Sequence, residues 1–268
     1  MKNWSVQVFF MELRQLITYR ADFWINFFGQ TFISLTIAYF LWDSIFLSAQ
    51  TKVMNGFTIQ GMIFYYLCVP LIFRVQQGQG IGFISREIYD GGLNKYLLYP
   101  IDIFKYKTAT YLANATFFLL QLFFLILIYN IFFYDPNVYS FSFLAGIKFL
   151  ILLVIASLSF FYLFLCCELM AFWFDNIWSL GVILRFITSF FGGALIPLAF
   201  FPNWAQEILR LTPFPYLIDF PMKALLNQLD THQFLINTTI SIIWMIMFRF
   251  LALSIWKRGQ YAYTGVGI

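Results

Sequence analysis

The residue types that carry catalysis or bind metals are sparse in this sequence. His232 is the only histidine among 268 residues, so a histidine-based triad, a multi-histidine metal site and an HExxH protease are excluded. The three cysteines, Cys68, Cys166 and Cys167, lie within apolar runs without CxxC spacing, which supports neither a zinc site nor a disulfide framework. We therefore expect no catalytic site, no metal and no cofactor on this chain.

Glycine patterns that hold nucleotides are also missing. No GxxxxGK[ST] motif occurs, so the chain should not bind ATP through a P-loop. Gly78, Gly80 and Gly82 give a GxGxG pattern, but it lacks the helix entry that a dinucleotide site requires.

Contact with a partner protein is a different kind of chemistry, and the polar stretch of residues 78–111 is suited to it. Apolar residues interrupt its charges at a spacing typical of a short helix, which the glycine pair can end. The candidate contact residues are Arg86, Glu87, Ile88, Asp90, Gly91, Gly92, Leu93 and Asn94. A solvated loop that only tethers two helices is the alternative, and the sequence leaves it open.

Glycines and prolines mark a second unusual segment, near the C-terminal third of the chain. These positions are Gly192, Gly193, Pro197, Pro202, Pro213 and Pro221. Prolines at such intervals break a helix repeatedly, while residues 205–211 and 221–226 still have the pattern of single amphipathic turns. We expect short broken helices that re-enter the outer leaflet over residues 202–233 and act as a gate, because its aromatic residues suit the membrane interface better than a plain loop.

The elements that must position these segments are apolar helices. The chain is 62% hydrophobic and only 10% charged, with 37 Phe, 16 Tyr and 8 Trp, which favours lipid over water as its surroundings. A bilayer core takes roughly 20 apolar helical residues to cross. Six segments are predicted to span it: Phe23–Leu47, Phe57–Phe73, Leu112–Tyr134, Phe143–Phe172, Ile177–Phe201 and Phe234–Trp256. The predicted fold class is all-α integral membrane, with one transmembrane domain over residues 1–268.

Residues 1–20 predict an amphipathic helix that lies at the membrane interface, because apolar residues recur on one side at helical spacing. Glu12 and Arg14 are its candidate functional charges. An early turn of the first span is the alternative, but these charges would be costly in hydrocarbon. The stretch lacks the uninterrupted apolar run of a cleaved signal, so we expect it to stay in the mature protein.

The positions of Lys and Arg predict the orientation. With the N-terminus inside, nine of them fall in inner segments and three in outer ones, which favours both termini in the cytoplasm. The net charge of +4 does not indicate nucleic-acid binding, because the basic residues are scattered singly. Arg185 lies about two turns inside the fifth predicted span and needs a partner there, for which Glu168 and Asp175 are the candidates.

Several of these segments, in this order, resemble the permeases of the ABC-2 family of transporters. The segments are residues 10–23, Arg86–Pro100, Gly193–Pro202 with its following prolines, and Trp256–Gly267. The resemblance implies six spans, a coupling helix between the second and third spans, and outer re-entrant helices after the fifth. It also implies a homodimer, or a heterodimer with a related permease, resting on two copies of an ABC ATP-binding subunit that holds ATP and Mg.

The same resemblance implies export, and together with the missing signal it favours a bacterial inner membrane. Phe-rich inner surfaces would suit an amphiphilic or hydrophobic substrate, and drugs, lipid-linked molecules, polysaccharide and peptides all remain open. A secondary transporter or channel would predict internal repeats and buried ion-coupling groups, which we do not find. A membrane-embedded transferase would predict clustered His, Asp or Glu at one membrane face, and one histidine argues against most such sites. A non-transporting assembly subunit would make the same partner contacts, so the sequence leaves it open.

Overall fold

The computed structural model describes residues 4–18, 20–78, 80–98, 101–133 and 142–263, and in these residues the fold is helical without a strand. The helices in chain order are α1 Trp4–Thr18, α2 Arg20–Ala49, α3 Ile59–Gln77, α4 Ser85–Tyr89, α5 Asn94–Leu98, α6 Ile103–Phe133, α7 Phe143–Leu169, η1 Met170–Phe172, α8 Trp178–Phe191, η2 Leu198–Phe200, α9 Asn203–Arg210, α10 Phe214–Leu217, α11 Asp219–Leu225 and α12 Thr231–Ala262.

Five of the described helices, namely α2, α3, α6, α7 and α12, are long and apolar enough to cross a membrane. The predicted fifth span, Ile177–Phe201, is shorter than expected. Its helix α8 has 14 residues, or about 21 Å, whereas the hydrocarbon core of a bilayer is about 30 Å thick. The helix ends at Phe191 because Gly192 and Gly193 follow, and the backbone of Gly193 turns to φ +96°.

Capping residues explain where two other helices differ from the predicted spans. α6 begins at Ile103 and not at Leu112, because the Asp102 carboxylate accepts hydrogen bonds from the amides of Phe104 (2.9 Å) and Lys105 (3.2 Å). The last part of the predicted 78–111 segment therefore belongs to a spanning helix. α12 likewise begins at Thr231, where Asp230 accepts a hydrogen bond from the amide of Gln233 at 2.6 Å.

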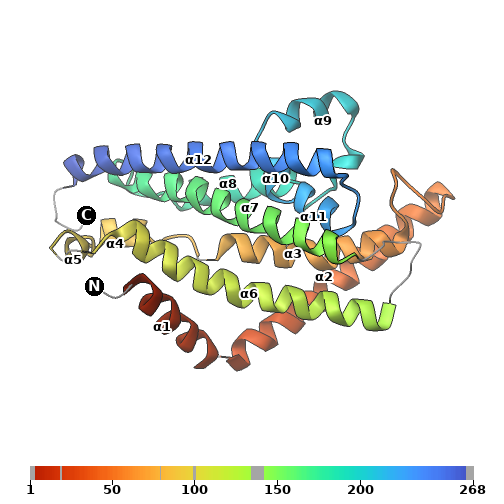
Figure 1. The fold of residues 1–268 in the computed structure, drawn as a ribbon, viewed down its shortest axis with the longest axis horizontal. Helices are drawn as coiled ribbons and strands as arrows, with labels where there is room; N and C mark the ends of the chain where they lie inside the picture. Colours follow the sequence, from red (N-terminus) through yellow and green to blue (C-terminus); the bar gives the residue numbers. More distant parts are fainter. Residues whose placement is uncertain (1–3, 19, 79, 99–100, 134–141, 264–268) are drawn as a thin grey trace.

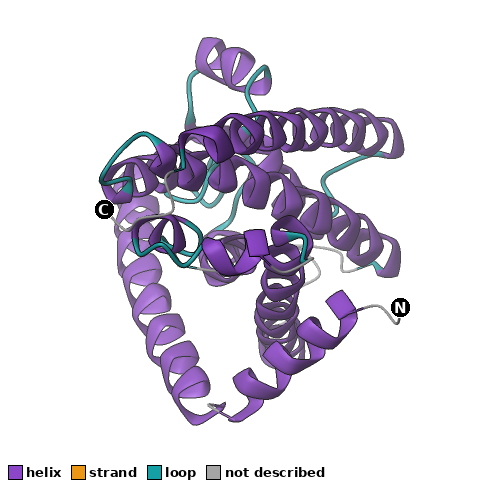
Figure 2. Cartoon of the chain, turned by 90° about the vertical axis from the view of Figure 1, so that its left-hand side faces the viewer, coloured by secondary structure: helices purple, strands orange, loops and turns teal. Residues whose placement is uncertain are grey.

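α7 is the central helix of the bundle, and α12 packs along its length while α3, α10 and α11 pack on its other sides (Figures 1 and 2). Its most apolar window is 61% buried, compared with 17% for those of α2 and α12. The peripheral helices carry large exposed apolar side chains such as Phe32, Phe186 and Phe250. These side chains are well suited to contact lipid or another membrane chain.

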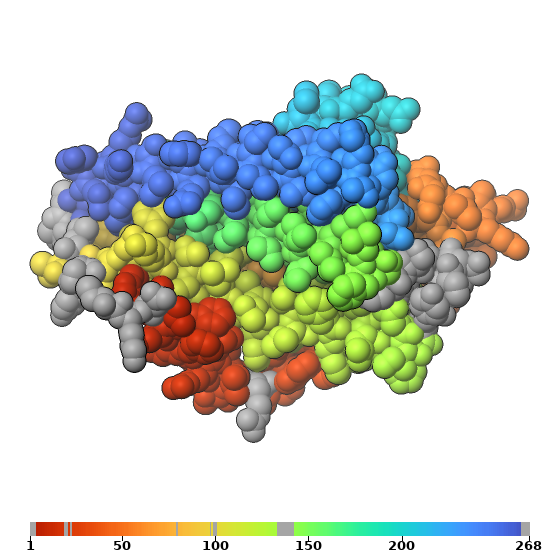
Figure 3. Space-filling view, viewed as in Figure 1, coloured from red at the N-terminus to blue at the C-terminus, as the bar shows by residue number. Residues whose placement is uncertain are grey.

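Two ends of the bundle can be distinguished in Figure 1. α4, α5, the start of α1 and the end of α12 lie toward one end, which we call the α4 end. α9 projects from the side of the bundle, away from α4 and α5, as the space-filling view also shows (Figures 1 and 3). α1 packs on the first part of α6 and diverges in direction from α2, so it is a separate helix and not an early turn of the first span.

Candidate functional site

α4 and α5 form a compact unit at the α4 end, built on buried apolar side chains. Ile84, Ile88 and Leu93 are almost completely buried. The amide of Leu93 donates a hydrogen bond to the carbonyl of Glu87 at 2.8 Å, and Gly91 has φ +70°, a conformation that glycine adopts without strain. The chain therefore folds back on itself between α4 and α5 and is not an open tether.

Glu168 holds the start of this unit. It lies in the last turn of α7 and is completely buried. One carboxylate oxygen accepts a hydrogen bond from the amide of Gly82 (2.8 Å), and the other accepts from the amides of Ile84 (3.3 Å) and Ser85 (3.0 Å). Free amides at the start of a helix favour a negative charge. The carboxylate thus joins α4 directly to the central helix.

A second set of polar contacts joins the unit to α6. The Lys107 ammonium lies 2.7 Å from the Glu87 carboxylate and is itself buried. The same carboxylate accepts a hydrogen bond from the Tyr96 hydroxyl at 3.2 Å and lies 3.7 Å from Lys95. Burial, and then the charge of Glu87, raise the pKa of Tyr96 above its usual value, so it remains a neutral donor.

A third contact joins α4 to the turn between α7 and α8. The Tyr89 hydroxyl donates a hydrogen bond to the carbonyl of Phe174 at 2.8 Å. Next to it, Phe172 packs against Gly259 of α12 so closely that a Cβ on the glycine would lie 2.1 Å from the ring. α4, the turn and α12 are therefore in one continuous packed layer.

These contacts separate the predicted contact residues into three groups. Ile88 and Leu93 are buried, and Glu87 is paired with Lys107, so these three support the fold of the unit. Gly91, Gly92 and Asn94 are partly buried. The exposed side chains of the unit are Arg86, Asp90, Lys95 and Leu98, the last with 82% of its surface exposed. Lys95 and Leu98 were not among the predicted contact residues.

The predicted charges of α1 face different ways. The Glu12 carboxylate accepts a hydrogen bond of 3.5 Å from the amide side chain of Asn114 on α6, whereas Arg14 is exposed. Glu12 thus fastens α1 to the same helix that holds Lys107.

The Glu168 carboxylate was predicted as a partner for Arg185, and the structure gives it a second role besides this electrostatic interaction. Its oxygens bond to the backbone of residues 82–85. The Arg185 guanidinium lies over the ring of Phe164, 4.9 Å from the ring centroid, and within electrostatic range of Glu168. No sequence pattern identifies backbone amides as the partners of an acid 83 to 86 positions away.

At the other end of α7, the broken helices α10 and α11 pack into the bundle. The carbonyl of Gly193 accepts a hydrogen bond from the Tyr65 hydroxyl of α3 at 2.7 Å, and the carbonyl of Gly192 accepts one from the amide of Asp219 at 3.0 Å. Pro221 lies in the buried first turn of α11 and Pro213 caps α10. Pro197 precedes η2, and Pro202 precedes the projecting helix α9. Five of the six predicted gate residues are therefore buried in the packed part, and Pro202 is exposed.

A buried ion pair lies in this part of the molecule. The Asp219 carboxylate is 2.6 Å from the Lys223 ammonium one turn later in α11, and Asp219 is only 2% exposed. Burial raises the pKa of Asp219, and Lys223 partly offsets that effect. The pair lies within α11, and the amide of Asp219 joins the start of that helix to the turn at Gly192.

We expect Gly193→Ala to destabilise this turn by about 1–2 kcal/mol, because alanine is strained at φ +96°. The new methyl group would also lie 3.1 Å from the Tyr65 hydroxyl and from Leu198. The matched control is Gly29→Ala on α2, where a Cβ meets nothing within 4 Å. Thermal unfolding in detergent should separate the two variants, and equal midpoints would contradict the strain argument.

Comparison with known proteins is consistent with this architecture. The model of a family described as ABC-2 family transporter protein matches residues 32–267, from α2 to beyond the end of α12. No curated protein and no solved structure matches the chain. The family match covers most of the sequence, including both the α4–α5 unit and the α9–α11 segment, and the described helices include five that can cross a membrane. The chain therefore belongs to the ABC-2 family of transporter proteins and is a multi-pass membrane protein.

Proposed function

We propose that this chain is the permease subunit of an ABC exporter, driven by ATP that a separate subunit hydrolyses. The observation that carries the proposal is the α4–α5 unit. It exposes Arg86, Asp90, Lys95 and Leu98 while three sets of contacts fix it to α6, to α7 and to the α7–α8 turn. A merely tethering loop would not need a buried carboxylate with three amide donors.

The contacts of α7 indicate how movement would cross the membrane. α7 has 27 residues, or about 40 Å of helix. Glu168 in the last turn of α7 binds the start of α4. α7 also packs against α10 and α11. A push on the exposed face of α4 and α5 would thus reach the α9–α11 segment through one rigid element. Packed interfaces of this kind switch between discrete arrangements.

In the proposed assembly two permeases, identical or related, rest on two ATP-binding subunits, which hold ATP and Mg. The α4 end and both termini face the cytoplasm, the protein lies in a bacterial inner membrane, and residues 202–233 form a re-entrant outer gate. The exposed charges of the α4–α5 unit support the placement of the ATP-binding subunit at that end. The substrate is an amphiphilic or hydrophobic molecule that is moved outward.

Reversing one exposed charge tests this assignment. Asp90→Arg should reduce the amount of ATP-binding subunit that co-purifies with the tagged chain by about tenfold, because a charge placed against a like charge at an interface costs several kcal/mol. Glu207→Arg on α9 is the matched control, since both acids are exposed, and it should leave recovery unchanged. Equal recovery with both variants would place the partner elsewhere on the chain.

A further inference from the structure

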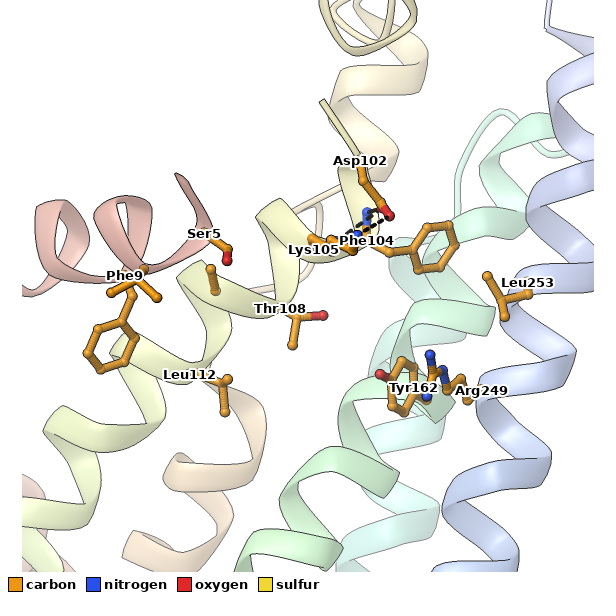
Figure 4. Close-up of a pocket in the computed structure, with 12 residues that line it drawn as sticks. Ser5, Phe9, Asp102, Phe104, Lys105, Thr108, Leu112, Tyr162, Arg249 and Leu253 are labelled. Carbon is orange, nitrogen blue, oxygen red and sulfur yellow. Dashed lines mark hydrogen bonds and ion pairs between the residues drawn. The ribbon is translucent and has the colours of Figure 1, made fainter. Parts of the chain in front are cut away.

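A cleft of about 550 Å³ lies between α1 and α6 on one side and α7 and α12 on the other, at the α4 end (Figure 4). Its walls are largely apolar and include Val6, Phe9, Leu112 and Leu253. Polar side chains line it as well: Ser5, Asp102, Lys105, Thr108, Tyr162 and Arg249. Tyr162 lines the cleft from α7 and Arg249 lines it from α12 (Figure 4).

Arg249 is the residue that needs explanation. It lies within the spanning helix α12, eight residues before Lys257, which places it about 12 Å deeper along the helix. A charge at that depth requires a partner. Its side chain is exposed, and none of the ion pairs among the described residues involves it.

The charges around the cleft favour an anion. Arg249 and Lys105 are basic, and Asp102 is the single acid in the lining. Asp102 is 3.8 Å from the Lys105 ammonium, and its carboxylate also caps the start of α6. The acid is thus engaged with its own helix, whereas the guanidinium is left to bind a ligand from outside the chain. The hydroxyl groups of Thr108 and Tyr162 are further lining donors.

We propose that this cleft binds an anionic phospholipid from the leaflet at the α4 end. Arg249 binds the phosphate, Lys105 lies at the edge of the head group, and the apolar walls contact the upper part of the acyl chains. Guanidinium groups suit phosphate because they offer parallel donors, and basic clefts between spanning helices are a setting in which lipid head groups bind. The lipid would also fasten α1 to α12, which otherwise face each other across the cleft. This inference does not depend on the proposed ATP-binding partner.

Lipid binding to the purified full-length chain tests the proposal. Native mass spectrometry after delipidation would compare added phosphatidylglycerol, phosphatidylcholine and inorganic phosphate. We expect phosphatidylglycerol to be retained by the unmodified chain and Arg249→Gln to weaken its binding by about tenfold or more, as expected for a lost hydrogen bond to a charged group. Arg258→Gln, an exposed arginine on the same helix outside the cleft, is the matched control and should bind normally.

Two further variants separate a ligand site from a folding defect. Arg249→Lys keeps the charge and should retain most of the binding. Leu253→Trp fills the cleft while leaving Arg249 in place, and it should also weaken the binding of phosphatidylglycerol. Three results would each overturn the proposal. They are undiminished phosphatidylglycerol binding by Arg249→Gln, retention of phosphatidylcholine equal to that of phosphatidylglycerol, and binding of inorganic phosphate as tight as that of the lipid.

Discussion

Replacing Glu168 with glutamine is expected to release the start of α4 from α7 and to disconnect ATP hydrolysis from movement of the α9–α11 segment. The carboxylate is completely buried and accepts three backbone hydrogen bonds. Glutamine keeps one oxygen, so at least one amide then faces an NH2 group. Hydrogen bonds to charged groups contribute about 1.5–3 kcal/mol each. Amide hydrogens of residues 82–85 should therefore exchange about tenfold faster or more.

The complex reconstituted with the proposed ATP-binding subunit gives a functional readout that requires no knowledge of the substrate. In the unmodified protein, ATP should change hydrogen exchange in α10 and α11, and in Glu168→Gln this response should be lost while ATP hydrolysis continues. Asp175→Asn is the control, because that carboxylate is exposed on the following turn. A response of α10 and α11 that survives in Glu168→Gln would show that α7 does not carry the coupling.

The second large effect is expected at the buried ion pair of α11. Lys223→Met leaves the Asp219 carboxylate buried without its cation, which should cost about 3 kcal/mol. This should lower the midpoint of thermal unfolding in detergent by roughly 5–10 °C. Asp219→Asn should cost less, because Lys223 is partly exposed and can reach water. The double variant Asp219→Asn with Lys223→Met should be more stable than Lys223→Met alone, since it removes the unpaired charge.

The pH dependence of the stability of Lys223→Met tests whether the unpaired Asp219 carboxylate causes the loss. Burial raises the pKa of Asp219, and loss of Lys223 removes a charge that lowers it. A carboxyl group with a higher pKa in the folded state binds more protons there, so its contribution to stability falls as the pH rises above its unfolded pKa. The difference in unfolding free energy between the unmodified protein and Lys223→Met should thus become smaller as the pH is lowered toward about 5. A deficit that is constant with pH, or a double variant as unstable as the single one, would contradict the argument.

Length and hydropathy were sufficient to locate α2, α3, α7 and α12, because an apolar run of about 20 residues with few charges is typical of a transmembrane helix. The same reasoning extended the fifth span to Phe201, since the residues after Phe191 remain apolar. Hydropathy alone could not show that the turn at Gly192 and Gly193 ends the helix, because the residues on both sides of the turn are apolar. It also placed the start of α6 too late, because the polar first turns of that helix, capped by Asp102, have no hydropathy signal.

The α4–α5 unit was located by its spacing of apolar residues and its glycine pair, but the direction of each side chain was not. Ile88 and Leu93 could equally form an exposed ridge or a buried one, and only the packing against the rest of the chain decides. Glu168 carried one available signal: an acid at the end of an apolar run, in a turn without Lys or Arg. That signal indicates a buried partner and does not indicate which one.

Site-specific photo-cross-linking in native membranes identifies which proteins contact the α4–α5 unit. A photo-reactive amino acid would replace Leu98 on α5 or, as the matched control, Trp204 on α9; both side chains are largely exposed. If this chain is the permease of an ABC exporter, the probe at position 98 captures a P-loop ATPase and the probe at position 204 does not. Capture of no ATPase at position 98, in membranes where the chain is present and folded, would contradict the account.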